Sequence, residues 1–465
     1  MCRTEGKIKD FTFWYILGGK WMKKVFIDKD DALNTARLQK IIQYHQQQIL
    51  PELVFNRGYY DGTGQVIMHR VLSDESKPNN KIVKNYCKSI VENFRGYITG
   101  KPITYSALGA DQDITTLLDV LNSNDYQNSD SEWLKNALIY GYAPQLCYVN
   151  ERNEYRFKNI NPEQVIPVYS ADLDEDLLYV IYYYPIVDWD NPQWEYNYSI
   201  NVYDAQNVYH FTSDSAFGTI VPSGEPEAHY FQEVPFSIFY LTDDAESIFK
   251  CVIGLQDAYN KLLSDSVNDW ESFVDAYMVL TNMSADAEDI KAMKENRVIL
   301  LDDDATVSYL TKSSSDTIVQ NLLDDINVAI HTISNSPDFS SEEFGSGVSS
   351  GIALQFKLVG FNNIASNIEN QFRKAIMKRI HLLNTIFTLI DWEAYDIHIE
   401  FNANLPTALS DTVDVVNKLR GLVSDETLLG MLPFVPDATE EVARVDAQND
   451  KLSGLYDFNL PEENK

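Results

Sequence analysis

Two stretches in the second half of the chain carry apolar side chains at three- and four-residue spacing, with polar side chains between them. The first runs from about Cys251 to Thr281 without a proline, and the second runs from Thr317 to Ser334 and stops before Pro337. This spacing is typical of amphipathic helices, which bury one stripe and expose the opposite face to water. We therefore predict two long helices, the first spanning roughly 45 Å at about 1.5 Å per residue.

The segment between these helices, 282–315, predicts a small αβ unit. A capped acidic helix comes first, and two β-rich runs follow it at 297–301 and 305–312. The acidic run 302–304 stands between them as a turn. The region as a whole therefore predicts a helical hairpin that carries a compact αβ cap.

The first half of the chain predicts helices followed by strands. Helical spacing covers Asp31 to about Asn56, with Pro51 interrupting its end. Residues 79–100 form a second helix, which begins after Pro78 with an asparagine cap and ends at a glycine. The elements expected after these are helices at 113–122 and 129–140 and a mostly antiparallel β domain from Tyr142 to Tyr240.

A third long helix is expected at Gly351–Asp391, followed by a strand at 395–402. Gly360 lies in the interior of that helix and weakens it, so we expect a kink near this glycine. Two or three short helices are expected within 406–450, and the polar residues after about Gly454 are expected to be loose. Together these elements predict an α+β fold.

Composition bounds the class of protein. With 465 residues, 45% of them hydrophobic, the chain can hold about two to four domains. The net charge of −32 argues against a protein that grips DNA phosphates and suggests solubility and repulsion of other anions. The four cysteines lack the spacing of a zinc site or a disulfide framework. We predict neither a signal peptide nor a membrane span, and residues 1–21 are either an upstream extension or a terminal arm.

Motifs for catalysis are weak. The nearest match to a phosphate-binding loop, Gly96–Pro102, has one residue too few between its glycines and a proline where the magnesium-binding hydroxyl belongs. The acidic run 172–176 lacks the glycine and the bidentate glutamate of a calcium loop, so a solvated turn explains it better. We predict no catalytic residue, cofactor or metal. A metal-dependent hydrolase with an acidic site in the β domain stays as the alternative function.

Two segments are distinctive, together with the order helix, insert, helix, loop, helix: YYDGTGQVIMHRVLSDESKPNNKIVKNYCKSIVENFRGYITGKPITY at Tyr59–Tyr105 and SSGIALQFKL at Ser349–Leu358. In these features the chain resembles the portal proteins of tailed double-stranded DNA bacteriophages. The closest branch is the one common in phages of Gram-positive bacteria. The match in element order covers the chain from about Asp31 to Asp450.

The resemblance implies a dodecameric ring at one capsid vertex of the virion, assembled in the cytoplasm of the host bacterium. Double-stranded DNA would pass through the ring during packaging and ejection without sequence-specific binding, and no membrane would be involved. The implied partners are the terminase large subunit, a head-to-tail adaptor protein, and the major capsid and scaffolding proteins.

The resemblance also implies a division of the chain into the parts of a portal protein. These parts are an N-terminal arm (1–30), a wing (31–247), a first stem helix (248–281), a clip (282–316), a second stem helix (317–337), a tunnel loop (338–350), a long kinked helix (351–391), a wing strand (392–404), a crown (405–450) and a flexible tail (451–465).

The apolar stripes of the two predicted stem helices agree with a ring. A hairpin of two such helices leaves apolar surface that a monomer cannot cover, and identical copies packed around a closed ring would bury it. The expected subunit contacts are Leu255, Tyr259, Leu262, Trp270, Leu322, Ile326 and Ile330. In the alternative of an acidic scaffold without a channel, a charge at Leu262 or Leu322 would disturb partner binding without abolishing a ring.

The predicted tunnel loop has no basic side chain. Between His331 and Lys357 the sequence holds no Lys or Arg, so the loop cannot form ion pairs with phosphates. We expect it to meet DNA through steric and water-bridged contact without base readout. Phe339 and Phe344 either anchor the loop to the long helix or touch the duplex. The loop residues are Asp338, Phe339, Ser340, Ser341, Glu342, Glu343, Phe344, Gly345, Ser346 and Gly347.

Overall fold

The computed structural model divides the chain into two compact units. The larger unit comprises Met1–Pro337 with Phe361–Ala403, and the smaller comprises Asp338–Gly360 with Asn404–Lys465. The structure describes residues 24–29, 34–75, 77–109, 112–187, 189, 196–215, 218–274, 278–281, 288, 291, 306–309, 316–339, 356–387, 393–404, 409–432, 435 and 438–456. Helices and sheets are mixed along the chain, which confirms the predicted α+β class.

The first helical segment begins at Thr35 and ends later than predicted. The helix α2 (Thr35–Tyr44) continues through a π-helical turn, η1 (His45–Ile49), into α3 (Leu50–Asp61). At that turn the Leu50 N–H donates to the His45 oxygen, five residues back instead of four. The ladder restarts at α3 with the proline in its first turn, where a missing N–H costs nothing. Pro51 therefore does not end the helix, which runs on to Asp61.

The β domain predicted for 142–240 is present as two sheets. The larger sheet is antiparallel except at one edge, where β1 (Val25–Ile27) pairs in parallel with β5 (Val165–Ser170). Its other strands are β6 (Leu177–Val187), β7 (Tyr196–Tyr203), β8 (Asn207–Ser213), β9 (Val221–Pro222) and β10 (Glu227–Ala228). The smaller sheet has the order β11 (Phe236–Tyr240), β3 (Tyr142–Val149) and β4 (Tyr155–Asn159).

Each face of the larger sheet has its own core. The side chains of Leu38, Ile41 and Ile42 on α2 pack against one face, as the three- and four-residue spacing of that helix requires. On the other face, Val180 meets Phe236 of the smaller sheet. The alternation of side chains along each strand places consecutive residues in different cores.

Two helices hold the smaller sheet around a buried tryptophan. Trp133 on α6 (Tyr126–Tyr140) donates its indole N–H to a β3 carbonyl at 2.8 Å. Its ring meets Phe239 of β11 and Phe372 of α12 (Val359–Ile386) edge to face. The predicted helix at 129–140 is confirmed with an earlier start. The helix α5 (Thr115–Ser123) confirms the helix predicted at 113–122.

The helix predicted at 79–100 begins later than expected. The structure places α4 at Tyr86–Thr99, with Asn85 as the N-cap that accepts from Lys88 N at 3.0 Å. Residues 80–84 are extended instead, because helix α7 (Ile253–Val274) supplies hydrogen-bond partners for their backbone. The predicted strand at 395–402 is confirmed as β14 (Ile397–Glu400), which pairs with β2 (Thr104–Ala107).

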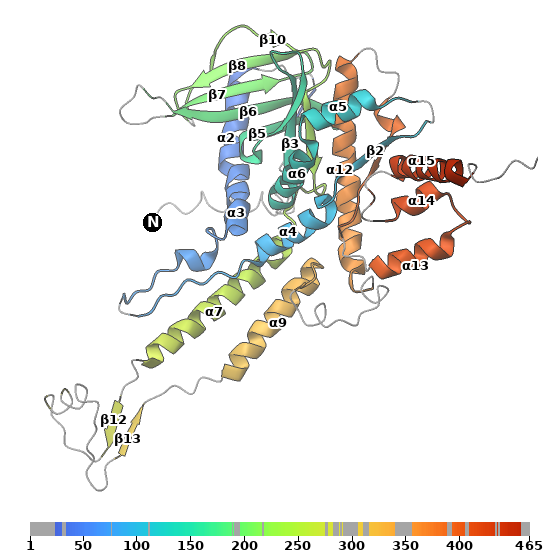
Figure 1. Ribbon diagram of the computed structural model, residues 1–465. Coiled ribbons are helices and arrows are strands. Elements are labelled where there is room, and N and C mark those ends of the chain that lie inside the picture. The colour runs from blue at the N-terminus through green and yellow to red at the C-terminus, as the bar shows by residue number, and fades with distance from the viewer. Residues whose placement is uncertain are drawn as a thin grey trace, which may run out of the picture. The chain divides into compact units, whose positions relative to one another are not determined.

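The predicted helical hairpin consists of α7 (Ile253–Val274) and α9 (Asp316–Ser334), and Figure 1 shows the two helices side by side. The first prediction was wrong at its end, since Met278–Thr281 is a strand, β12, that pairs with β13 (Thr306–Tyr309). Pairing with a distant strand overrides the helical spacing there. The predicted run 297–301 and the acidic turn 302–304 lie outside the described residues.

The smaller unit holds helices near the C-terminus, where two or three short ones were predicted. They are α13 (Leu409–Leu419), α14 (Asp425–Gly430) and α15 (Ala438–Tyr456). Ser424 caps α14 by accepting a hydrogen bond from the Thr427 N–H. The prediction of a loose tail after about 450 was wrong as far as Tyr456, because α15 continues through those residues. Gly360 is the second residue of α12, not an interior one, and the kink stays a prediction.

Candidate functional site

Helices α7 and α9 pack together at their inner ends around one tyrosine. The ring of Tyr86, the first residue of α4, lies edge to face against Tyr259 of α7 at 5.2 Å and against His331 of α9 at 5.7 Å. Lys84 places its ammonium group over the rings of Tyr86 and Tyr259 at 4.9 and 5.1 Å. These contacts fix the level at which the two antiparallel helices meet. At about 1.5 Å per residue, the 22 residues of α7 extend about 33 Å.

A polar face of α7 binds the extended segment that precedes α4. Gln256, Asn260, Ser264 and Asn268 repeat every four residues, so they form one row along the helix. Their side-chain oxygens accept hydrogen bonds from every second backbone N–H of residues 80–86. The four pairs are Asn80 N to Asn268 Oδ1 at 2.8 Å, Ile82 N to Ser264 Oγ at 3.0 Å, Lys84 N to Asn260 Oδ1 at 3.0 Å, and Tyr86 N to Gln256 Oε1 at 2.8 Å.

The spacing of this ladder follows from helix and strand geometry. Four residues of helix rise about 6 Å, and two residues of extended chain rise about 6.6 Å, so the partners stay in register over four steps. Gln256, Asn260 and Ser264 are fully buried under the extended segment. A buried amide or hydroxyl needs partners, and here the backbone of residues 80–86 supplies them. We call residues 66–86, from the 3-10 turn η2 (Val66–His69) to the first residue of α4, the strap.

The two halves of the strap are tied to each other and to α7. Arg70 donates to Asn79 Oδ1 at 2.9 Å and to Asn80 O at 2.8 Å, and it pairs with Asp265 of α7 at 2.5 Å. Lys81 Nζ donates to a backbone carbonyl of η2 at 2.9 Å. Neither the strap nor the ladder was predicted from the sequence. The repeat of uncharged polar residues every four positions on an otherwise acidic helix was the signal that could have found them.

The predicted subunit contacts fall into three groups by exposure. Tyr259 and Ile330 are buried within the chain, with exposed fractions of 7% and 0%. Three members are half-buried: Leu255, Leu262 and Ile326. The exposed members are Trp270 at 74% and Leu322 at 46%.

The inner end of the stripe is therefore used inside the protomer. Ile330 has no surface left for a neighbouring copy, because it is fully buried within the chain. We restrict the proposed contact to the exposed outer part of the hairpin. Ile318, with an exposed fraction of 58%, extends this outer surface on α9, whereas Ile333, 50% exposed, lies at the inner end beyond Ile330.

The chain that leaves α9 is anchored before the predicted tunnel loop begins. The His331 ring nitrogen Nδ1 lies 2.8 Å from Ser336 O, and Asn93 of α4 donates to Ser336 Oγ at 3.0 Å. Asn335 adopts a left-handed conformation with φ of 51°, which turns the chain out of the helix. Of the loop residues, Asp338 and Phe339 are described, and the remaining positions, Ser340–Gly347, lie outside the described residues. Phe339 is 49% exposed.

The acidic run 172–176 is paired with lysines. Lys29 Nζ lies 2.7 Å from Asp176 and 3.6 Å from Asp172, and Lys24 lies 3.2 Å from Glu175. The hydrogen bond to Asp176 raises the pKa of Lys29. Within the described ranges, no three His, Cys, Asp or Glu side chains gather as metal ligands would. The run therefore acts as a charged turn at the edge of the larger sheet.

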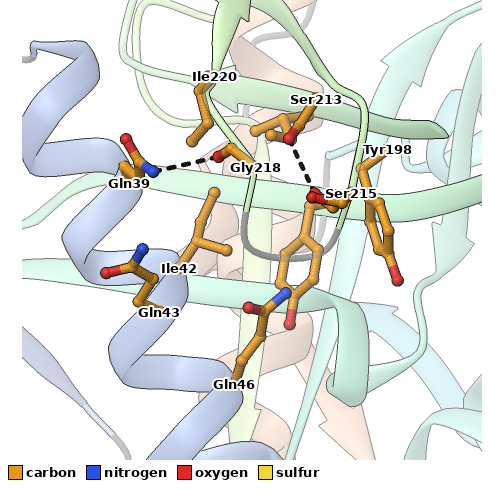
Figure 2. Close-up of a pocket in the computed structure, with 11 residues that line it drawn as sticks. Gln39, Ile42, Gln43, Gln46, Tyr198, Ser213, Ser215, Gly218 and Ile220 are labelled. Atoms are coloured by element: carbon orange, nitrogen blue, oxygen red, sulfur yellow. Dashed lines mark hydrogen bonds between the residues drawn. The ribbon is translucent and has the colours of Figure 1, made fainter.

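A narrow pocket opens between α2 and the larger sheet (Figure 2). Gln39, Gln43 and Gln46 line it on the helix side, and Gln39 donates to Gly218 O at 3.1 Å. Ser213 closes the sheet side by donating to Ser215 O at 2.8 Å. The lining residues that the structure describes carry amides and hydroxyls but no carboxylate, imidazole or amine. They can form hydrogen bonds to a small polar molecule, but they offer no acid or base for chemistry near neutral pH.

Comparison with known proteins identifies what this arrangement resembles. The family described as phage portal protein, SPP1 Gp6-like, matches residues 39–454. The chain is 23% identical to the portal protein of Bacillus phage SPP1, over 92% of this chain and 89% of that protein. It is 20% identical to the portal protein of Clostridium phage phiCD119, over 88% of this chain and 92% of that protein. Among the described helices, none is both long and apolar enough to cross a membrane.

Proposed function

The chain belongs to the SPP1 Gp6-like family of phage portal proteins, and from this premise we propose how its parts serve a DNA channel. The match confirms the resemblance drawn from the sequence, including its branch, since both relatives come from phages of Gram-positive hosts. Membership carries with it a portal function, an oligomeric ring at the capsid vertex and a place in the virion. The family is structural, and we propose that this chain has no catalytic activity of its own.

We propose that the ring is a dodecamer assembled in the host cytoplasm. In it, α7 and α9 would form the stem, with β12 and β13 at the base of the clip. The β domain, with α2 to α6 and β14, would form the wing, and α13 to α15 would form the crown. The observation that carries the proposal is the family match over residues 39–454. The exposed apolar outer surface of the hairpin supports it, because identical neighbours would cover that surface.

We propose that the clip and stem bind the terminase large subunit during packaging and a head-to-tail adaptor afterwards. The wing and crown would face the major capsid and scaffolding proteins. These partners follow from the division of the chain into portal parts. Removal of residues 282–305 tests the proposed terminase contact. This deletion should abolish terminase binding while the ring persists.

We propose that DNA slides through the ring without being gripped. Twelve copies at −32 each would surround the duplex with negative charge, and the loop 338–350 has no Lys or Arg to pair with phosphates. A protein that neutralises phosphates loses affinity steeply as salt rises, with a slope of about −0.9 per phosphate in a logarithmic plot. The ring should instead show weak DNA retention at low salt, and this retention should stay constant or increase as salt shields the repulsion.

The experiment that tests the proposal is electron microscopy of the purified protein with native mass spectrometry of the same sample. We expect closed rings with a central hole and a mass of twelve chains. A solitary chain at high concentration would contradict the portal assignment of this protein, and closed rings of another size would contradict only the dodecamer. Steep loss of DNA retention between about 50 and 200 mM salt would contradict passive sliding.

A further inference from the structure

The stem hairpin has two different flanks. Figure 1 shows α7 between α9 on one side and the strap on the other, and the hydrogen-bonded ladder fixes the strap in that place. A closed ring of identical chains joins copies head to tail, so each copy needs two unlike surfaces that fit each other. The strap and α9 are such a pair of surfaces.

The strap is basic in an otherwise acidic chain. Its four cations, Arg70, Lys77, Lys81 and Lys84, outnumber its two carboxylates, Asp74 and Glu75, whereas the whole chain has 69 acidic and 37 basic side chains. It also exposes two apolar side chains, Val66 at 61% and Val71 at 88%. Arg70 is paired with Asp265 of α7, Lys84 lies over the rings of Tyr86 and Tyr259, and Lys77 pairs with Asp74. The positive charge that the strap offers a neighbour is therefore centred on the exposed Lys81, beside the exposed apolar side chains.

The outer side of α9 has the opposite character. Ile318, Leu322 and Ile333 are exposed, and their spacing of four and eleven residues places them on one side of the helix. Asp325 is exposed at the edge of this stripe, three residues after Leu322. The helix contains three aspartates and no Lys or Arg. It thus offers an apolar stripe bordered by negative charge.

The charges of the two flanks lie at the same level of the hairpin. The ring of Tyr86 contacts both Tyr259 of α7 and His331 of α9, so these two residues lie at the same level of the hairpin. The two helices are antiparallel, and Figure 1 shows them side by side. The two neighbours of Lys81 in the strap bond to Asn268 and Ser264 of α7. Lys81 therefore lies beside a point on α7 about seven residues along that helix from Tyr259. Seven residues back along α9 from His331 is position 324, one residue from Asp325. Rotation about the ring axis brings groups of equal level next to each other.

We propose that the strap of one copy packs on the outer side of α9 of the next copy, with Lys81 paired to Asp325 and Val71 against the stripe of Leu322. The inference rests on the proposed ring. Copies with a charge of −32 repel one another, so a stable contact needs local attraction of this kind to offset that repulsion. The strap and α9 supply opposite charge together with apolar surface to bury.

Charge reversal at the two positions tests the pairing. Lys81→Glu should set glutamate against Asp325 at every contact, and Asp325→Lys should set lysine against Lys81. Each single variant should raise the protein concentration needed for half-assembly by about tenfold or more at low salt. The combined variant Lys81→Glu with Asp325→Lys restores opposite charges at every contact and should assemble like the wild type. Asp324→Lys, which changes the neighbouring residue on another side of α9, is the matched control and should assemble normally.

Mixing the two single variants gives a sharper result. In an alternating ring, Glu at position 81 meets Lys at 325 at one contact and the original Lys81 meets Asp325 at the next. The mixture should therefore form rings that neither variant forms alone, as seen by mass photometry and electron microscopy. Circular dichroism of each variant checks its fold.

Three results would overturn the inference or its premise in distinguishable ways. If both single variants form rings at the wild-type concentration, the strap does not meet α9. If the single variants fail and neither the mixture nor the combined variant recovers, these two residues do not face each other. If the wild-type chain forms no ring at all, the proposed function fails before the contact is tested.

Discussion

Asn260 is the ladder residue that joins the strap to a second buried amide, Gln65. Its Oδ1 accepts from Lys84 N at 3.0 Å, and its Nδ2 donates to Gln65 Oε1. Asn260 and Gln65 are both fully buried. The change Asn260→Ala therefore leaves one backbone donor and one amide acceptor buried without partners. At about 1–3 kcal/mol for each such group, the strap should lose roughly 2–6 kcal/mol of its attachment to α7.

Local hydrogen exchange is the suitable measurement. Global unfolding of a ring-forming chain with two units is not a two-state process, so its midpoint would not report the strap alone. The amides of Ile82, Lys84 and Tyr86 should be protected in the wild type, because each donates to an α7 side chain. In Asn260→Ala, exchange of the peptide that covers 80–86 should become roughly 100-fold faster, which corresponds to about 3 kcal/mol.

A neighbouring exposed residue supplies the control. Lys261 lies next to Asn260 on α7 but points to solvent, and Lys261→Ala should leave exchange in the strap unchanged. Equal exchange of residues 80–86 in the two variants would refute the account of the ladder. Faster exchange across the whole chain would instead indicate a global loss of stability.

Three further predictions concern the interior of the larger unit. Arg379→Met should cost about 3–5 kcal/mol in urea denaturation, because it leaves Asp130 as an unpaired buried charge, and a combined Asp130→Leu change should recover most of this loss. Burial lowers the pKa of His45 to about 3, so the unfolded state binds more protons than the folded state between about pH 3 and 6.5. The free energy of unfolding should therefore fall as the pH drops through this window. Thermal denaturation should show a smaller fall in His45→Gln. Gly141→Ala should lower the thermal midpoint strongly, because Gly141 has a φ of 86° and an added Cβ would lie 1.9 Å from the backbone oxygen of Ala245. Gly96→Ala is the control and should not lower the midpoint, because no atom lies within 4 Å of an added Cβ there.

Local patterns in the sequence were enough to predict the order of the elements and most of their types. Regular spacing of apolar residues predicted α7, α9 and α12, and alternating β-branched and aromatic runs predicted the β domain. The capping residue Ser424 and the helix end at Gly141 were equally local signals, since each depends on backbone geometry within a few residues. The family resemblance, carried by two short segments, needed no tertiary information either.

Contacts between segments far apart in the chain set which faces of those elements are buried. The row of Gln256, Asn260 and Ser264 looks like a wet face in the sequence, but it is buried because the strap, 170–182 residues away along the chain, lies over it. The same strap delays the start of α4, since its backbone is already hydrogen-bonded to α7. Ile330 is covered while Leu322 is exposed, although both belong to one apolar stripe. Local spacing fixes which residues share a side of a helix, and only the contacts of distant segments fix what that side meets.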